Sequence, residues 1–280
     1  SEASKELFIS QPGLTTSIRE LETEMGIKIF TRTNKGVVTS NEGERFLGYA
    51  RQVLEQASLL EGVYKSGTKI KQQFCVSTQH YSFAVNAFVD LIRRFAGEEY
   101  DFSLRETETY EIIDDVAKMK SEIGILYLNS FNKDALMKII KSKSLTFTEL
   151  FTAKPHVFVS TDHPLADKKS VTMEELADYP YLSFEQGEHN SFYYSEEIFS
   201  TVGRTKNIRV TDRATLFNLL IGLNGYTVCS GVIDNELNGD NITAIPLDEE
   251  GNMKIGYIEN KKILHSNLAE AYIEALKKHI

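Results

Sequence analysis

Short polar runs follow several predicted strands in the C-terminal part of the chain. In open parallel sheets, ligands lie beyond the carboxyl ends of the strands and against helix N-termini. We therefore predict a small-molecule site there, with Phe184 as an apolar wall; helix capping is the alternative role for Thr78, and the preferred one for Asp212. The predicted ligand-contacting residues are Ser77, Thr78, Gln79, His80, Thr107, Glu108, Phe184, Glu185 and Thr211.

No pattern in the sequence indicates catalysis or metal binding. The six histidines lack the spacing of metal ligands, and His156 and His163 do not fall on one helical face. The sequence has neither a glycine-rich phosphate loop nor a Gly-x-Ser-x-Gly nucleophile turn. The acidic pairs Asp114–Asp115 and Glu196–Glu197 are predicted to lie on solvated helix faces. These observations disfavour an enzyme, a resident cofactor and a metal site.

A second group of polar residues begins a predicted helix near the N-terminus. Ser10 is a candidate N-cap, and Pro12 falls in the first turn, where its missing N–H costs nothing. An apolar stripe from Leu14 to Met25 follows, and Gly26 ends the helix. Together with a short helix before it, this pattern fits either a helix-turn-helix or an ordinary helical hairpin.

A predicted β-hairpin follows and favours the DNA-binding alternative. Residues 27–30 and 37–39 are predicted strands, and a basic turn over 31–36 joins them. Basic residues in such a wing contact phosphates and add affinity without reading sequence, whereas the start of the second helix enters the major groove. The predicted DNA-contacting residues are Ser10, Gln11, Pro12, Thr15, Thr16, Arg19, Arg32 and Lys35.

Residues 43–66 carry a heptad-like apolar pattern over three repeats, with charged residues outside it. An amphipathic helix packed on its own domain would show the same pattern. Because the segment directly follows a winged helix, a dimerising linker helix is the preferred interpretation. Its predicted seam consists of Phe46, Ala50, Val53, Ala57, Leu60 and Tyr64, and residues 66–68 are a predicted hinge.

From residue 71 onward, predicted strands alternate with predicted helices, which indicates βαβ units and a mostly parallel sheet. The predicted strands are 74–77, 102–106, 123–127, 156–159, 181–184, 208–210, 226–229 and 254–258, with crossing segments at 145–151 and 242–247. The predicted helices are 83–95, 112–119, 173–177, 191–201, 216–223 and 268–276.

Several of these residues and segments together resemble a known family. The run Ser10-Gln11-Pro12 with Leu14-Thr15, Leu21-Glu22, Met25-Gly26, Ile29-Phe30, Arg32-Thr33 and Glu42-Gly43 is similar to the LysR-type transcriptional regulators, as are segments 161–166 and 210–225. The family often has a basic residue where this chain has Thr16. It also has about one more helix before residue 1, so the DNA-binding head is expected to be incomplete at its N-terminus.

The resemblance implies an α/β protein with three parts. These are a winged helix-turn-helix head (1–42), a linker helix with its hinge (43–70), and a two-lobed periplasmic-binding-protein-like effector domain (71–280). Lobe I would comprise about 71–147 and 249–280, and lobe II about 148–248. The resemblance further implies binding of double-stranded promoter DNA, a homodimer or homotetramer, and effector contact through the loop 78–80.

The charge distribution fits a regulator that binds DNA through paired heads. Residues 1–70 contain nine basic and nine acidic residues, so nine minus nine is zero and the whole net charge of −9 lies beyond residue 70. A neutral head disfavours nonspecific coating of DNA. No apolar run approaches the ~20 residues of a membrane span, and the two cysteines fit small core positions in a reduced cytoplasm.

Two arguments from charge favour different effectors. Helix N-termini favour a carboxylate. However, Glu108, Glu185 and Asp212 lie at the strand ends, where no lysine or arginine is expected, so a zwitterionic or neutral polar compound is preferred. A solute-binding protein of a transporter and an α/β enzyme with an accessory helical domain are the other classes considered. The first has no use for residues 1–66, and the second needs a reactive constellation that the sequence lacks.

Overall fold

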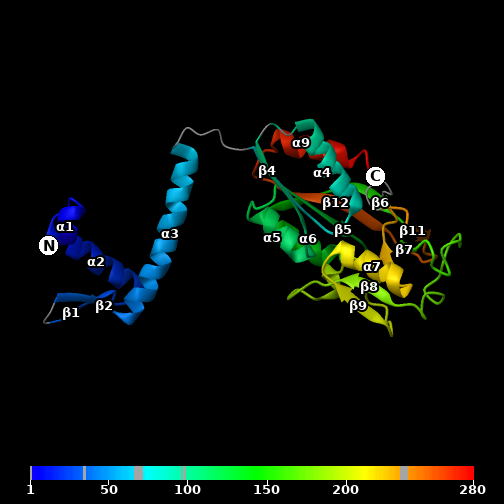
Figure 1. Ribbon diagram of the computed structural model, residues 1–280, viewed down its shortest axis with the longest axis horizontal. Coiled ribbons are helices and arrows are strands. Elements are labelled where there is room, and N and C mark those ends of the chain that lie inside the picture. The colour runs from blue at the N-terminus through cyan, green and yellow to red at the C-terminus, as the bar shows by residue number, and fades with distance from the viewer. Residues whose placement is uncertain (1, 34–35, 66–71, 96, 98, 234–238) are drawn as a thin grey trace. The chain divides into compact units, whose positions relative to one another are not determined.

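The computed structural model describes residues 2–33, 36–65, 72–95, 97, 99–233 and 239–280. The chain divides into two compact units, residues 1–70 and 71–280 (Figure 1). Within the described residues, no helix is both long and apolar enough to cross a membrane.

The first unit begins with two helices, α1 (Glu2–Glu6) and α2 (Gln11–Met25). Ser10 caps α2, since its side-chain oxygen accepts a hydrogen bond of 3.2 Å from the N–H of Gly13. Gly26 ends the helix in the left-handed conformation, at φ 65°. The predicted helix-turn-helix elements, with their predicted N-cap and stop, are therefore present.

A two-stranded wing follows, formed by β1 (Phe30–Thr33) and β2 (Gly36–Thr39) in antiparallel register. The first strand begins at Phe30, three residues later than the predicted strand 27–30, so Arg32 lies on β1 rather than in the turn. Residues 27–29 instead pack against α2: Ile29 is 2% exposed and its N–H donates to the Glu22 carboxylate.

The linker helix α3 spans Asn41–Lys65. Its first turn is fixed by Ser40, whose oxygen accepts a hydrogen bond of 2.9 Å from the N–H of Gly43. A Cβ atom at Gly43 would lie 2.2 Å from the carbonyl oxygen of Ile29. Only glycine therefore lets the start of α3 pack this closely against the wing.

Lobe I of the second unit is a five-stranded sheet in the order β4-β3-β5-β12-β6. Strands β4, β3 and β5 are parallel, and β12 runs antiparallel to both β5 and β6. The elements are β3 (Gln72–Thr78), α4 (Ser82–Phe95), β4 (Tyr100–Glu106), α5 (Thr109–Ala117), β5 (Ile123–Leu128), α6 (Lys133–Ser142), β6 (Leu145–Ala153), β12 (Met253–Asn260) and α9 (Asn267–Leu276).

Lobe II is built on an antiparallel sheet in the order β10-β7-β11 and a parallel pair, β8 and β9. Its elements are β7 (His156–Ser160), β8 (Tyr181–Phe184), the 3₁₀ turn η1 (Phe192–Tyr194), β9 (Asn207–Val210), α7 (Arg213–Leu223), β10 (Thr227–Cys229) and β11 (Ile242–Pro246). An apolar cluster that includes Leu182, Val210, Leu216 and Ile242 forms part of its core.

The two-lobed α/β fold is confirmed, with local corrections. The predicted helix 191–201 is wrong, because only η1 forms there, and residues 173–177 form turns rather than a helix. Helix α6 was not predicted, although Leu136 and Ile140 form its buried stripe. The mostly parallel arrangement holds for three strands of lobe I but not for the main sheet of lobe II, where β7 has antiparallel partners.

Candidate functional sites

The start of α2 presents a polar, exposed surface. Gln11, Thr16 and Arg19 are exposed, while Thr15 is half-buried and donates its hydroxyl hydrogen to the carbonyl oxygen of Gln11 at 2.9 Å. The other predicted DNA-contacting residues lie nearby in the sequence: Ser10 and Pro12 at the exposed helix start, Arg32 exposed on β1, and Lys35 outside the described residues.

Glu22 holds the wing against α2, a role that the sequence reasoning missed. Its carboxylate accepts hydrogen bonds from the N–H groups of Ile29 (2.8 Å) and Phe30 (3.0 Å), and Lys28 pairs with it at 3.1 Å. The Phe30 N–H, the Lys28 ammonium and the Ile29 N–H together lower the pKa of Glu22 against the opposing effect of burial. Glu22 is 6% exposed, so this carboxylate is an internal anchor rather than a surface charge.

The predicted dimerisation seam is partly exposed where the side chains of α3 are described. Val53 is 66% exposed and Ala57 is exposed, while Phe46 and Ala50 are half-buried. The side chains of Leu60 and Tyr64 lie outside the described part of the helix. Tyr49 and Leu54 are 65% and 66% exposed and extend the apolar surface.

The end of β3 and the residue after it are tied into lobe I by hydrogen bonds. The Ser77 hydroxyl donates to the Asp115 carboxylate at 2.8 Å, and Thr78 is fully buried with its hydroxyl on the carbonyl oxygen of Gln79. Gln79 is 1% exposed; its amide donates to Thr109 and its oxygen accepts from the Tyr127 N–H at 3.0 Å. In this conformation these side chains are occupied by internal partners, so their predicted effector contact stays a prediction.

His80 connects the two lobes. Its N–H donates to Glu196 Oε2 at 3.0 Å, its Nδ1 lies 2.9 Å from the same oxygen, and its ring stacks on Phe184 with centroids 3.7 Å apart. Burial acts to lower the pKa of His80, but the Glu196 carboxylate outweighs it, and the pKa is raised. His80 and Phe184, both predicted for the site, are thus brought together across the cleft.

The N-terminus of α5 is closed by a side chain of lobe II. The N–H of Thr109 donates to Gln186 Oε1 at 3.0 Å, and the Thr109 hydroxyl donates to the Tyr194 carbonyl oxygen at 2.7 Å. Beside them, Glu108 contacts Gly187 so closely that a Cβ atom there would lie 2.5 Å from a Glu108 oxygen. Burial and the acidic neighbours Glu111 and Glu185 raise the pKa of Glu108.

The pair Glu196–Glu197 is buried, which corrects the predicted solvated helix face. The two residues are 7% and 3% exposed. Glu197 accepts a hydrogen bond of 2.8 Å from the Phe184 N–H, and burial next to Glu196 raises the pKa of Glu197 to about 8. The absence of a helix at 191–201 explains the error, because the segment turns these side chains inward.

The second acidic pair, Asp114–Asp115, is also buried rather than solvated, at 8% and 0% exposure. Asp115 pairs with Arg105 at 2.9 Å as well as with Ser77. Asp114 pairs with Lys118 at 2.7 Å and Lys143 at 3.0 Å, and these two hydrogen bonds lower its pKa. Both carboxylates stabilise lobe I.

The remaining predicted residues lie at the rim of the cleft. The cleft also contains one cation, Arg213, that the sequence did not predict there. Thr107 is half-buried; Glu185 and Thr211 are exposed. Asp212 caps α7 as predicted, accepting from the Thr215 N–H at 2.8 Å. Contrary to the expectation of no arginine at these strand ends, Arg213 lies in the cleft and pairs with Glu106 at 2.9 Å.

The cleft around His80 is almost filled by these side chains. It retains a cavity of about 40 Å³, lined among others by His80, Phe184, Glu197, Arg213 and Phe217, which holds a few water molecules at most. A molecule of metabolite size therefore fits in this cleft only when the lobes separate. In the described residues, no group of three or more His, Cys, Asp or Glu is placed to hold a metal ion.

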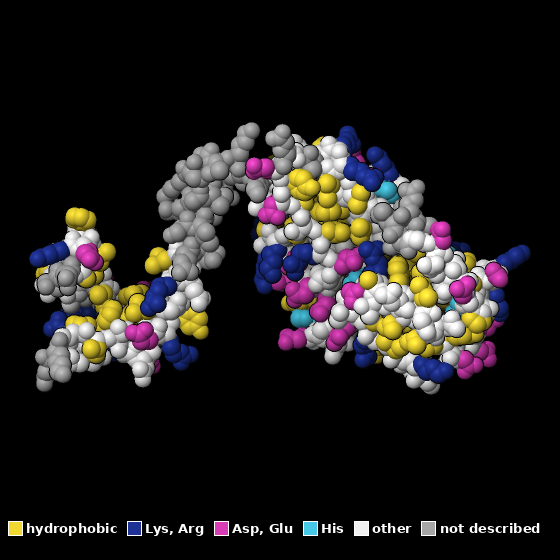
Figure 2. Space-filling view, in the orientation of Figure 1, with side chains coloured by type: hydrophobic (Ala, Val, Ile, Leu, Met, Phe, Trp, Pro, Cys, Tyr) yellow, Lys and Arg dark blue, Asp and Glu magenta, His cyan; other side chains and the backbone are white. Residues whose placement is uncertain are grey.

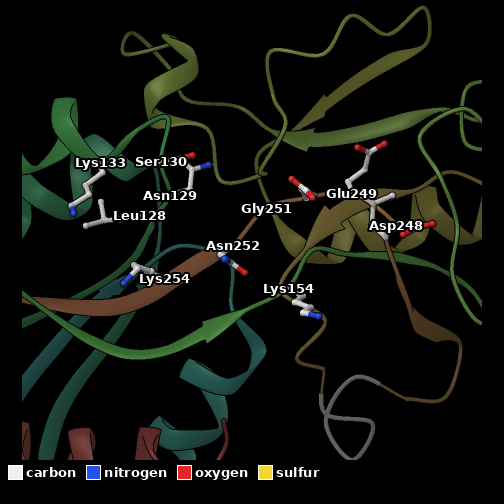
Figure 3. Close-up of a pocket in the computed structure, with 12 residues that line it drawn as sticks. Leu128, Asn129, Ser130, Lys133, Lys154, Asp248, Glu249, Gly251, Asn252 and Lys254 are labelled. Atoms are coloured by element: carbon white, nitrogen blue, oxygen red, sulfur yellow. The ribbon is translucent and has the colours of Figure 1, made fainter.

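A larger cavity of about 940 Å³ lies where the chain crosses between the lobes (Figure 3). The close-up shows Lys154 beside the β6–β7 crossing and Asp248, Glu249 and Gly251 on the returning segment, with Lys133 and Lys254 across from them. The three lysines face a lining that also includes Asp248, Glu249 and Glu250, so its charges nearly balance. Nothing in the sequence had indicated this cavity.

Comparison with known proteins identifies the family. Residues 1–44 match the family model described as "Bacterial regulatory helix-turn-helix protein, lysR family", and residues 76–280 match "LysR substrate binding domain". The HTH-type transcriptional regulator CysB of Burkholderia cenocepacia is 28% identical over 191 residues, covering 66% of this chain and 57% of that protein. The RuBisCO operon transcriptional regulator of Allochromatium vinosum is 27% identical over 207 residues, covering 72% and 64%.

Solved structures show the same fold. HinK, a LysR family transcriptional regulator from Pseudomonas aeruginosa, superposes with a TM-score of 0.50 at 18% identity, covering 99% of this chain and 91% of that one. Full-length BenM does so with a TM-score of 0.50 at 20% identity, covering 99% and 90%. The aligned stretches span between 57% and 64% of the two curated relatives named above.

A winged helix-turn-helix followed by a linker helix and a two-lobed α/β unit defines the class of DNA-binding regulators that carry a ligand-binding domain. Within that class, the substrate-binding domain of one family matches residues 76–280, most of the chain. The chain belongs to the LysR family of transcriptional regulators.

Proposed function

We propose that this protein is a DNA-binding transcriptional regulator, not an enzyme, whose binding to promoter DNA is modulated by a small-molecule effector in the cleft between the lobes. The observation that carries the proposal is the exposed polar start of α2 beside the wing, the arrangement that places side chains on base edges. It acts in the cytoplasm as a homodimer or homotetramer. Two exposed apolar side chains of α3 support that assembly, Val53 in the predicted seam and Leu54 beside it.

The effector is a zwitterionic or neutral polar metabolite. The carboxylates of Glu106 and Glu196 border or line the His80 cavity beside Glu197, whose raised pKa favours its neutral form, and Arg213 is already paired with Glu106. A simple dianion would meet the remaining negative charge, whereas a compound with an ammonium and a carboxylate could match both signs. The ring of Phe184 supports an apolar portion of the ligand.

Effector binding changes the contact between the lobes. Gln186 and Glu196 of lobe II occupy backbone N–H groups of lobe I, at Thr109 and His80, that a ligand oxygen would otherwise take. An effector must displace or bridge these contacts, and its differential affinity for the open and closed arrangements sets the population of each. On the face shown in Figure 2, basic and acidic side chains are interspersed over this unit. The contacts in the cleft are buried, and burial strengthens electrostatic contacts.

A binding experiment on DNA tests the regulator assignment. Fluorescence anisotropy would compare a labelled duplex from the DNA upstream of the protein's own gene with a scrambled duplex of equal length, at several salt concentrations. We expect at least about a thousandfold preference for the specific duplex, in the range of specific DNA-binding proteins. Equal affinity for both duplexes at every salt concentration contradicts the proposal.

A second experiment tests the effector chemistry. Thermal shift of the full chain would compare the twenty amino acids, as zwitterions, with succinate and malate, as dianions. A shift with a zwitterion that disappears in Arg213→Gln, and not in the exposed-site control Arg93→Gln, supports the cleft assignment. A dianion bound in the cleft of a crystal structure would overturn the charge argument.

A further inference from the structure

The two-stranded sheet β8–β9 has one apolar and one polar face. Leu182 and Val210 point into the core cluster of lobe II. Tyr181 pairs with Asn207, and Ser183 pairs with Arg209, across the two strands. Because side chains alternate along a strand, these four residues share the opposite face.

The segment between β8 and β9 covers that polar face and leaves a cavity of about 650 Å³. All of its lining comes from residues 181–209, within lobe II, so it does not depend on how the lobes meet. The sheet supplies Ser183, Asn207 and Arg209, and the covering segment adds Asn190, Ser200 and Thr201. A pocket of this size accommodates a small metabolite.

Arg204 is held rigidly at this pocket. Its Nε donates to the Tyr226 hydroxyl at 3.2 Å, its Nη1 donates to the carbonyl oxygens of Phe199 and Val202 at 3.1 Å, and its guanidinium lies 3.8 Å above the Tyr181 ring. Its Nη2 and the Tyr181 hydroxyl are buried without a hydrogen-bond partner. Both atoms are shielded from the cavity by their neighbours, so Arg204 contributes its positive charge to the pocket wall rather than a free donor inside the pocket.

The charge of the pocket favours an anion. Arg204 and Arg209 contribute positive charge, and the carboxylates in the lining are Glu185 and Glu197. Glu185 and Arg209 are both exposed, so solvent screens both charges, whereas Arg204 is half-buried. The raised pKa of Glu197, about 8, favours its neutral form at pH 7. Hydroxyl, amide and guanidinium donors thus predominate around the cavity.

We propose that this lobe II pocket, lined by Ser183, Arg204, Asn207 and Arg209, is a second binding site that takes a small oxyanion, the carboxylate or phosphate group of a metabolite. The guanidinium of Arg209 and the Ser183 hydroxyl bind the oxyanion from the floor of the pocket. Phe184 and Glu197 line both this pocket and the His80 cavity, so the two sites share a wall.

Calorimetry of the full chain tests the proposal. Succinate and glycerol 3-phosphate are titrated as the carboxylate and phosphate probes, and glycerol as the uncharged probe. The variant Arg209→Gln removes the floor cation, and Arg93→Gln, an exposed arginine on α4, is the control with the same charge change. Ser183→Ala removes one hydroxyl, and Arg209→Lys keeps the charge but loses the guanidinium group. Thermal unfolding of each variant shows whether it is still folded.

We expect one or both anions to bind with one-to-one stoichiometry and glycerol not to bind. Arg209→Gln should weaken binding about tenfold or more, Ser183→Ala and Arg209→Lys less, and Arg93→Gln not at all. The anion that binds identifies the group as carboxylate, phosphate or either. Three results would overturn the proposal. One is that neither anion binds at a probe concentration of about 10 mM, where even a weak relevant affinity would be detected. The others are that glycerol binds as tightly as the anions, or that Arg209→Gln and Arg93→Gln weaken binding equally. None of these outcomes bears on DNA binding, so the regulator assignment stands or falls separately.

Discussion

Oε1 of Gln186, in lobe II, accepts a hydrogen bond of 3.0 Å from the N–H of Thr109, the first residue of helix α5 in lobe I. The first N–H groups of a helix have no partner within the helix and attract polar oxygens of ligands. Here the protein's own amide takes that position, while Glu196 does the same at the N–H of His80. The cleft is therefore closed by groups that imitate a ligand.

The variant Gln186→Ala should loosen this closure. Loss of one buried hydrogen bond between the lobes costs about 1 kcal/mol, so the Thr109 amide should exchange with solvent roughly five- to tenfold faster. Hydrogen exchange with mass spectrometry on peptides that contain residue 109 measures this. Gln72→Ala, at an exposed position on β3, is the control. Unchanged exchange at Thr109 would mean that the closure does not depend on Gln186.

Stability should fall as the pH rises through neutrality, because of Glu197. Its pKa is raised from 4.5 to about 8, so between these values the folded protein keeps a proton that the unfolded chain releases. His80 acts in the same direction, since its raised pKa stabilises the fold at low pH and that contribution is lost as the pH rises.

The variant Glu197→Gln should remove most of that dependence. We expect the free energy of unfolding to rise by roughly 1–3 kcal/mol at pH 8.5 and to change little at pH 5, because a neutral amide needs no proton. Urea unfolding at the two pH values measures it, with Glu185→Gln at an exposed position as the control. An equal gain at both pH values would show that packing, not ionisation, is responsible.

The contrast between Asp212 and Glu197 shows how far the sequence could predict this site. Asp212 acts within its own helix turn, capping the Thr215 N–H three residues away, so local spacing was sufficient. Glu197 acts through the Phe184 N–H thirteen residues earlier, across a segment that lacks the predicted helix. Local periodicity cannot report a contact that depends on how an irregular segment folds back.

The same reason explains the anchors that were missed. Gln186 meets Thr109 across 77 residues of sequence, and Glu22 meets Phe30 across a turn. Each is a polar residue whose type suits a surface equally well, so only the fold distinguishes the two roles. The strand ends, by contrast, follow from the βαβ order, so the sequence could place His80 and Phe184 beside the cleft, where the structure has them. Their contact with an effector stays a prediction.

Glu22→Gln should weaken the wing. The amide can keep one hydrogen bond but loses the charge that the Phe30 N–H, Lys28 and the Ile29 N–H stabilise, so the head should melt several degrees lower at pH 7. Because the pKa of Glu22 is lowered, its contribution is present above pH 4.5 and lost as the pH falls through the folded pKa. The wild type and the variant should therefore converge in acid. Near-UV circular dichroism at pH 7 and pH 3.5 measures this, with exposed Glu24→Gln as the control.

Val53→Asp should break the pairing of two chains. Val53 is 66% exposed in the single chain, and a charge placed there would be buried in the predicted seam without a partner. The variant should lower the affinity between the two chains about tenfold or more, because burying an unpaired charge costs more than about 1.4 kcal/mol. Sedimentation velocity measures the mass. Gln52→Asp, one position along on the same helix and outside the seam, is the control, and equal effects of both variants would contradict the seam.

The residues of α2 should recognise bases, and the basic residue of the wing should add affinity that does not depend on sequence. The Thr15 hydroxyl donates its hydrogen to the Gln11 carbonyl oxygen, so towards the groove it can only accept, from an adenine or cytosine amino group, or touch a thymine methyl. Thr15→Ala and Gln11→Ala should each cost about 1–3 kcal/mol at one base pair and relax the preference there. Arg32→Ala, in the wing, should weaken all sequences alike and reduce the salt slope by roughly one. Anisotropy with duplexes substituted at single base pairs measures both effects. An altered base preference in Arg32→Ala, or a uniform loss in Thr15→Ala, would reverse the roles assigned to the wing and to α2.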